Sequence, residues 1–131
     1  MTDTATNEAT TTQLVDAYFD LWRETDEGAR AEQVARVFAP DGRHVDPLAD
    51  ANGHDGLAEM MANVHAHYPG FAIQRTSGID QHNDQLRFAW RLDAADGTPV
   101  VEGIDVAELT ADGRLARVAG FWGDLPPQEA G

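Results

Sequence analysis

Three residues that can hold or donate a proton interrupt apolar segments of this sequence. Tyr18 lies in a run with helical spacing, Asp46 ends a short run just before a proline, and Asp105 interrupts a strand-like run. A carboxylate in such surroundings is costly unless it is paired, hydrogen-bonded or protonated. Groups held in this way are typical of acid–base sites. Tyr18, Asp46 and Asp105 are therefore the first candidates for chemistry.

Asp105 is the best supported of the three on physical grounds. Alternate residues of a strand share one face of a sheet. Asp105 would therefore share its face with four apolar residues, Val101, Gly103, Ala107 and Leu109. We expect the Asp105 side chain to point into the core.

A histidine precedes Asp46 by two residues, so His44 and Asp46 project from the same side of their segment. A His–Asp pair could orient the carboxylate or shift its pKa. The alternative is a half-buried histidine bonded to the backbone. The five histidines of the chain show no i, i+4 pair, and the sequence predicts no metal site.

The composition narrows the classes of function. The chain has 131 residues, enough for one domain, and 42% of them are hydrophobic, as in a globular protein. Its formal net charge is −14, from 23 acidic and 9 basic residues. Binding to nucleic acid or to an anionic membrane surface depends on basic side chains, so neither partner is expected.

Two missing residue types exclude further chemistry. Every basic residue is arginine, so a lysine Schiff base cannot form. Cysteine is absent, which excludes a thiol nucleophile, a disulfide and a thiolate metal site. The sequence shows neither a signal peptide nor an apolar stretch of the roughly 20 residues that span a membrane. We expect a cytoplasmic protein.

Hydrophobic periodicity predicts three helices, over residues 11–24, 28–38 and 55–68. The expected inward side chains are, in chain order, Leu14, Tyr18, Leu21 and Trp22, then Val34, Val37 and Phe38, then Leu57, Met61, Val64 and Tyr68.

Strands are predicted at residues 43–46, 71–78, 84–94, 99–110 and 114–123. Three segments predict turns, Pro40-Asp41-Gly42, Asp96-Gly97 and Asp112-Gly113, and residues 47–53 predict a loop. The chain ends are expected to be tails, residues 1–10 disordered and residues 125–131 irregular, around one domain over 11–124.

Helices collected first and strands after them predict an α+β fold. The three helices would pack on one face of a curved, mostly antiparallel sheet. Such a sheet buries one face and leaves an internal pocket between the two layers.

Four segments carry a resemblance to a known superfamily, namely residues 17–21, 38–47, 100–105 and 112–115. Over about residues 11 to 123, the chain resembles the SnoaL-like and ketosteroid isomerase-like proteins of the nuclear transport factor 2 superfamily. The resemblance implies a cone-shaped α+β fold with a deep apolar pocket, a homodimer, and an enzyme without a cofactor.

The resemblance also implies roles for the three residues. Ketosteroid isomerase has a catalytic aspartate in an Asp-Pro step after its first short strand, and Asp46 matches it. Its oxyanion-hole tyrosine matches Tyr18, and its protonated aspartate on a late strand matches Asp105. Asp46 would then be a general base with a modestly raised pKa, assisted by His44. Tyr18 and Asp105 would donate hydrogen bonds to an enolate oxygen.

A small hydrophobic molecule is the expected partner of this site. The residues expected to line its pocket are Trp22, Met61, His65, Trp90, Val118, Gly120 and Trp122. Aromatic side chains at such positions are also common core residues. The same alternative holds for Tyr18, while Asp46 before a proline could simply cap or turn the chain.

Three hypotheses for the function follow. The leading one is an isomerase or cyclase that shifts a proton on a small hydrophobic carbonyl compound. The second is an epoxide hydrolase-like or dehydratase-like enzyme of the same fold, in which Asp46, Arg87 and Asp105 would activate water. The third is a non-catalytic module for small-molecule binding or dimerisation. A fold alone does not decide among them.

Overall fold

The computed structural model describes residues 4–129, and this range contains three helices and seven strands. The helices are α1 (Thr4–Arg23), α2 (Glu27–Val37) and α3 (Gly53–His67). The strands are β1 (Phe38–Asp46), β2 (Ala49–Asn52), β3 (Ala72–Arg75), β4 (Asp80–His82), β5 (Gln85–Asp93), β6 (Pro99–Leu109) and β7 (Leu115–Trp122). No helix of this range is long and apolar enough to cross a membrane.

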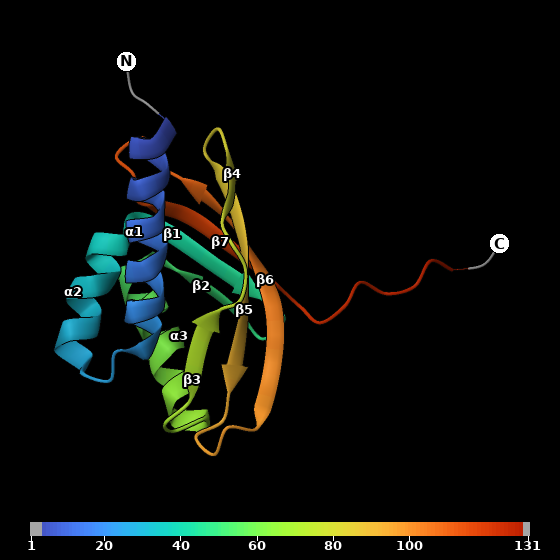
Figure 1. The fold of residues 1–131 in the computed structure, drawn as a ribbon. Coiled ribbons are helices and arrows are strands. Elements are labelled where there is room, and N and C mark those ends of the chain that lie inside the picture. The colour runs from blue at the N-terminus through green and yellow to red at the C-terminus, as the bar shows by residue number, and fades with distance from the viewer. Residues whose placement is uncertain (1–3, 130–131) are drawn as a thin grey trace.

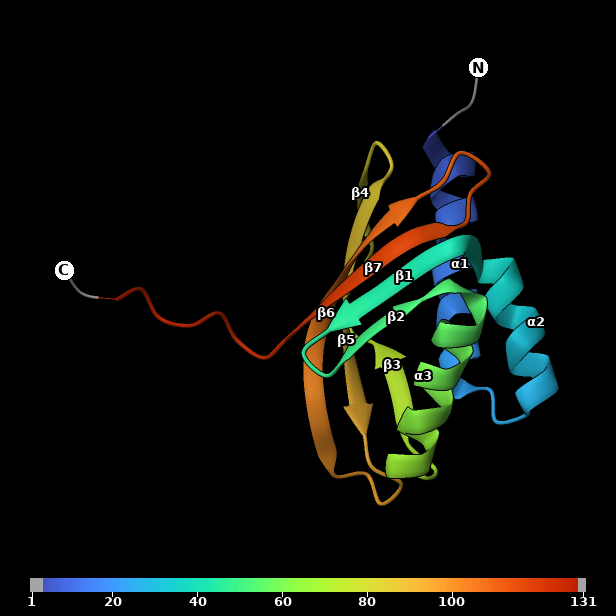
Figure 2. The ribbon, with the colours of Figure 1, turned by 180° about the vertical axis from the view of Figure 1, so that it is seen from behind.

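The three helices cover one face of a single curved sheet, whose other face carries no helix (Figures 1 and 2). The strand order is β2-β1-β7-β6-β5-β3, and β4 pairs with β5. The β1–β7 pair is parallel and the other pairs are antiparallel. The predicted α+β class, with three helices on a curved and mostly antiparallel sheet, is confirmed.

Apolar stripes and caps explain the helices. The stripe of α1 has the spacing i, i+3, i+4, i+7 of one helix face, and its buried members are Val15, Tyr18, Phe19 and Trp22. α2 begins after Asp26, whose carboxylate accepts a hydrogen bond from the Ala29 amide at 2.8 Å. Such a cap satisfies an amide that the helix itself leaves unpaired.

The sheet that carries the core follows the predicted alternation. The inward residues of β5 are all buried, namely Leu86, Phe88, Trp90 and Leu92. The β5–β6 and β6–β7 hairpins turn at Gly97 and Gly113, where φ is 89° and 84°. Glycine adopts such positive φ values without steric cost. Both predicted Asp-Gly turns are therefore confirmed.

The predicted turn at Pro40-Asp41-Gly42 is wrong, because these residues lie inside β1. The pairing of β1 with β7 changes register between Phe38 and Arg43, as it does at a β-bulge. A proline has no N–H to donate, so it is accommodated where the hydrogen-bond ladder is interrupted.

The predicted loop over residues 47–53 is also partly wrong. Residues 49–52 form β2, which pairs with β1 so that Ala49 lies opposite Asp46. Ala, Asp and Asn are depleted in strands, so the pattern of this segment did not indicate one.

Two helix ends differ from their predictions. α1 begins at Thr4, so residues 4–10 of the predicted disordered tail are helical; no Gly or Pro separates them from the rest of the helix. The remaining tail residues, 1–3, lie outside the described residues. The prediction that Tyr68 faces inward is wrong, since its exposed fraction is 42%. α3 ends at His67, and the backbone of Tyr68 leaves the helical path.

The C-terminal segment leaves the domain at the end of β7 and extends away from it (Figure 1). Residues 125–129 form no helix or strand. The last two residues of the predicted tail, 130–131, lie outside the described residues.

Candidate active site

Asp105 of β6 lies in the core and binds two hydrogen-bond donors. The Tyr18 hydroxyl, from α1, donates to Oδ2 of Asp105 at 2.8 Å. The indole N–H of Trp90, from β5, donates to Oδ1 at 3.0 Å. Asp105 is 4% exposed and Tyr18 is 2% exposed. The prediction that Asp105 points into the core is confirmed, and helix α1 and the sheet meet at this carboxyl group.

His44 and Asp46 form the second half of the candidate site, at the end of β1. Nε2 of His44 lies 2.9 Å from Oδ2 of Asp46. The backbone amides of Leu48 and Ala49 donate to Oδ1 of Asp46, each at 2.9 Å. Asp46 therefore pairs with His44 and also holds the β1–β2 turn, as the structural alternative drawn for it from the sequence predicts.

The two halves meet above Gly120 of β7. A Cβ atom on Gly120 would lie 3.0 Å from Oδ1 of Asp105 and 3.3 Å from Cβ of Asp46. Glycine at this position thus lets the two acidic side chains approach each other over the strand. We call Tyr18, His44, Asp46, Trp90 and Asp105 the acid–base cluster.

Burial dominates the electrostatics of Asp105 and Tyr18. The pKa of Asp105 is raised, because burial disfavours its charged form more than His44, Tyr18 and Trp90 favour it. The pKa of Tyr18 is raised well above its ordinary value by burial and by the charge of Asp105. Both groups therefore tend to hold their protons.

Asp46 has the opposite character. Burial acts to raise its pKa, but the hydrogen bonds from His44 and from the Leu48 and Ala49 amides outweigh burial, and the pKa is lowered. The expectation of a modestly raised pKa is therefore wrong for this structure, because two amides and an imidazole stabilise the carboxylate. The cluster therefore brings together two carboxyl groups whose pKa values are shifted in opposite directions, that of Asp46 downward and that of Asp105 upward.

One buried polar atom of the cluster makes no hydrogen bond within the described residues. Nδ1 of His44 is buried and has no hydrogen-bond partner among the described residues. The ring of Trp22 packs edge-on against the imidazole, with centroids 5.7 Å apart. A buried polar atom without a partner is costly, so Nδ1 marks a place where a ligand group could bond.

Two hollows lie away from the cluster. One, of about 320 Å³, is lined by Asp16, Phe19, Asp20, Arg23 and Arg75. The other, of about 210 Å³, is lined by Ala17, Asp20, Gln33, Arg36 and Val37. Neither touches the cluster, whose members fill the space between helix and sheet with their own contacts. The most open side chain of the His44–Asp46 pair is that of Asp46, which is 14% exposed.

The predicted pocket residues have different surroundings. Trp22, Trp90 and Gly120 contact the cluster, as described above. Met61 and Val118 are fully buried members of the apolar core. Nε2 of His65 lies 2.8 Å from the backbone oxygen of Trp22. Trp122 ends β7 and is only partly buried.

Arg87 is not part of the site. Its guanidinium donates to Asp80 at 2.8 Å, and both side chains are more than half exposed. The Asp46, Arg87 and Asp105 set needed to activate water is therefore not assembled. Among the described residues, no three His, Asp or Glu side chains are grouped so that they could hold a metal ion.

Sequence reasoning missed one contact that defines the site. Trp90 was assigned to a pocket wall, but its N–H binds Asp105. This contact depends on cross-strand register, which no local pattern specifies. The amides that donate to Asp46 match the cap or turn drawn from the sequence as the alternative for this residue.

Comparison with known proteins agrees with this architecture. The family model of the SnoaL-like domain matches residues 15–118. The chain belongs to the SnoaL-like family. All five residues of the acid–base cluster lie within the matched residues.

Solved structures of this family and fold superpose on the chain. A putative isomerase of the SnoaL-like family from Agrobacterium tumefaciens has 32% sequence identity and a TM-score of 0.83, covering 88% of this chain and 99% of that one. A putative SnoaL-like polyketide cyclase from Jannaschia has 17% identity and a TM-score of 0.74, covering 93% and 91%. A putative polyketide cyclase from Sinorhizobium meliloti has 21% identity and a TM-score of 0.67, covering 82% and 93%. No curated protein matches the chain.

Proposed function

We propose that this SnoaL-like protein is a cofactor-independent isomerase or cyclase that shifts a proton on a small, uncharged carbonyl compound. The observation that carries the proposal is the acid–base cluster, in which the pKa of Asp46 is lowered while that of Asp105 is raised. Paired groups whose environments push their pKa values apart are the usual division between base and acid.

The proposed roles follow from this division. Asp46, charged at neutral pH, removes a proton from the carbon next to the carbonyl. Tyr18, paired with neutral Asp105, stabilises the negative charge that develops on the carbonyl oxygen. His44 holds the Asp46 carboxylate through Nε2, and its buried Nδ1 has no hydrogen-bond partner among the described residues. A substrate would approach along the partly exposed Asp46 side chain. Its binding would remove water from the Asp46 carboxylate and make that carboxylate a stronger base.

Related proteins support the reaction class. The relative with 32% identity is named a putative isomerase, and two proteins that share the fold are named putative polyketide cyclases. Isomerisation of a carbonyl compound and cyclisation of a polyketide can both begin with removal of a proton beside a carbonyl group. That shared step is the one the cluster would perform.

The charges around the cluster support an uncharged substrate. Arg43 is paired with Asp50, Arg91 with Asp93 and Arg114 with Asp112. No arginine of the described residues is among the groups that shift the pKa of Asp46 or Asp105. The group beside the two aspartates that can become positive is His44. A substrate carboxylate would meet two acidic side chains with no arginine to bind it, so an ester or ketone fits better than a free acid.

Deuterium uptake from D2O tests the proposed reaction. We expect the protein to speed exchange at the carbon next to the carbonyl in a 5-ene-3-ketone or in a β-keto ester. The free acid matched to that ester should exchange more slowly, and mass spectrometry measures both. Incorporation of 18O from labelled water into an epoxide, without any carbon exchange, would instead support the hydrolase alternative. Ligand binding without exchange would support a binding module.

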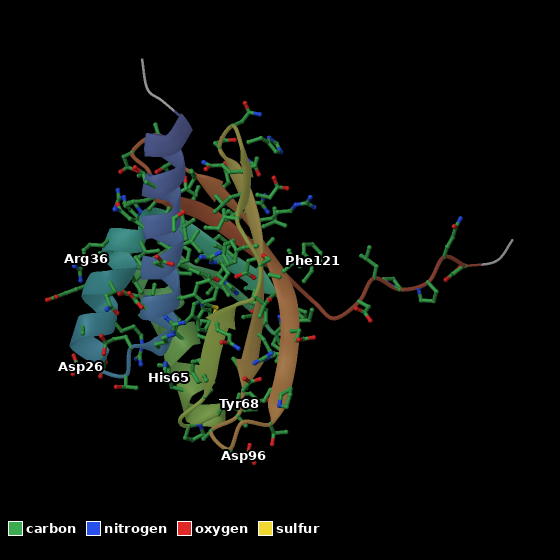
Figure 3. All side chains as sticks on the ribbon, in the orientation of Figure 1. Asp26, Arg36, His65, Tyr68, Asp96 and Phe121 are labelled. Carbon is green, nitrogen blue, oxygen red and sulfur yellow. The ribbon has the colours of Figure 1, made fainter. Side chains whose placement is uncertain are left out.

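We also propose that two copies of this chain associate through the helix-free face of the sheet. Ile104 and Phe121 are paired neighbours on β6 and β7, and they are 47% and 66% exposed. Figure 3 shows Phe121 on the side of the sheet opposite the helices. Residues of opposite charge also lie opposite each other on neighbouring strands, Arg91 of β5 with Glu102 of β6 and Glu108 of β6 with Arg117 of β7. The chain is strongly acidic overall, and two such chains repel each other. A face that is apolar and has little net charge is therefore the surface best suited to self-association.

Replacing Phe121 by Asp tests the dimer. We expect the parent protein to sediment as a dimer and the Phe121→Asp protein to sediment as a monomer, because a charge would be buried unpaired in the interface. Leu125→Asp is the matched control, since Leu125 is 93% exposed in the C-terminal segment. A monomeric parent protein, or a variant that remains dimeric, would refute this interface.

A further inference from the structure

The indole ring of Trp90 rests on Gly103, its cross-strand partner in the β5–β6 pair. A Cβ atom on Gly103 would lie 2.7 Å from Cζ2 of Trp90 and 2.5 Å from the backbone oxygen of Phe121. Both separations are too short for a real side chain. The absence of a side chain at residue 103 therefore lets the indole lie flat on β6, and its N–H reaches Asp105 two residues further along.

The indole also decides how Asp105 can carry a proton. An indole N–H is a donor and never an acceptor. Oδ1 of Asp105, 3.0 Å from that N–H, must therefore act as an acceptor. A proton of neutral Asp105 then belongs on Oδ2, which faces the Tyr18 hydroxyl at 2.8 Å. With Asp105 neutral, the direction of this hydrogen bond is the reverse of the one described above: Oδ2 donates to the Tyr18 oxygen, and the Tyr18 hydroxyl can donate its own proton elsewhere.

Among the described residues, Oδ1 of Asp105 has no hydrogen-bond donor other than the indole N–H of Trp90. The position of a Cβ on Gly120 is only 3.0 Å from Oδ1, so β7 closes that side. The other ionisable groups that act on Asp105 are Tyr18 from α1 and His44 and Asp46 from β1. Of these, Tyr18 is the one bonded directly to Asp105.

We propose that Trp90, seated on Gly103, is a positioning residue that keeps Oδ1 of Asp105 as an acceptor and directs the carboxyl proton to Oδ2 and Tyr18. This inference rests on the proposed function and refines it. Tyr18 touches the substrate oxygen, and Asp105 acts through Tyr18.

The proton count balances along this chain of hydrogen bonds. The carbon acid loses its proton to Asp46, and the negative charge moves to the carbonyl oxygen. That oxygen accepts a hydrogen bond from Tyr18, while the oxygen of Tyr18 accepts one from Oδ2–H of Asp105. Asp46 then returns its proton to a carbon of the product. Tyr18 and Asp105 end with the protons they began with.

The variant Trp90→Phe removes the N–H and keeps an aromatic ring. We expect the pKa of Asp105, measured by carbon-13 NMR titration, to rise above its value in the parent protein, because a donor to the charged form is lost. Where a substrate is turned over, kcat should fall by up to about tenfold, the effect of losing one hydrogen bond between uncharged groups. An unchanged Asp105 pKa in Trp90→Phe would overturn the inference, whether or not the protein has the proposed activity.

The variant Gly103→Ala tests whether the indole of Trp90 needs a residue without a side chain beneath it. It should raise the Asp105 pKa by displacing the indole, and it should add no further rise in a protein that already carries Trp90→Phe. Gly78→Ala is the matched control, because a Cβ there meets nothing within 4 Å. An equal additional rise in the double variant would show that Gly103 acts independently of Trp90. If Gly103→Ala does not fold, the titration of Trp90→Phe decides alone.

Discussion

The substitution Asp46→Asn is expected to lower kcat by about 10²–10⁴-fold, the usual contribution of a general base. The change is nearly isosteric, and the amide oxygen of Asn can still accept the hydrogen bonds of the Leu48 and Ala49 N–H groups. The β1–β2 turn should therefore survive while the base is lost. The measurement is the rate of deuterium uptake into the carbonyl compound that the parent protein exchanges fastest.

Asp50→Asn is the matched control for this variant. Asp50 lies opposite Val45 on the neighbouring strand, is ion-paired with Arg43 and is about half exposed. Its removal changes the net charge by the same amount and should leave exchange unchanged. Because the pKa of Asp46 is lowered, protonation of this base should not reduce kcat/KM of the parent protein until the pH falls below about 4, the ordinary aspartate value. Equal rates for Asp46→Asn and the parent protein would remove Asp46 from the mechanism.

The substitution Tyr18→Phe is expected to lower kcat by about 10²–10³-fold, as removal of one oxyanion donor does. The hydroxyl is the donor that faces Asp105 at 2.8 Å. Its loss leaves Oδ2 of a buried carboxyl group without a partner, which should also cost about 1–3 kcal/mol of unfolding free energy. Deuterium uptake measures the first effect and urea denaturation the second.

Tyr68→Phe is the control for the loss of a phenol hydroxyl. Tyr68 is 42% exposed at the end of α3, so this variant should keep both activity and stability. If Tyr18→Phe lost stability but kept full activity, Tyr18 would be a core residue that satisfies Asp105 and no more. That outcome would support the structural alternative drawn for it from the sequence.

Much of the fold follows from local patterns that the sequence displays. The alternation of β5 and the Asp-Gly turns at Gly97 and Gly113 were predicted because strand period and turn chemistry are local properties. The parallel pairing of β1 with β7 was not predicted. It joins segments about seventy residues apart in sequence, and no local pattern specifies such a contact.

The candidate site, like the fold, could be predicted from the sequence only in part. Burial of Asp105 could be inferred from its apolar strand face, and the pairing of His44 with Asp46 from their spacing of two. The pKa of Asp46 could not, because burial and hydrogen bonds act on it in opposite directions. Which of them prevails depends on the geometry of two amides. The contact of Trp90 with Asp105 needed the register of β5 against β6.

The central claim is that one cluster holds Asp46 charged and favours a neutral Asp105. A carbon-13 NMR titration of the aspartate carboxyl groups tests it most directly, with Asp46→Asn and Asp105→Asn used to assign the two signals. We predict that Asp46 ionises below the ordinary aspartate pKa of about 3.9 and that Asp105 ionises above it. Ionisation of Asp105 at or below that value, together with Asp46, would contradict the account.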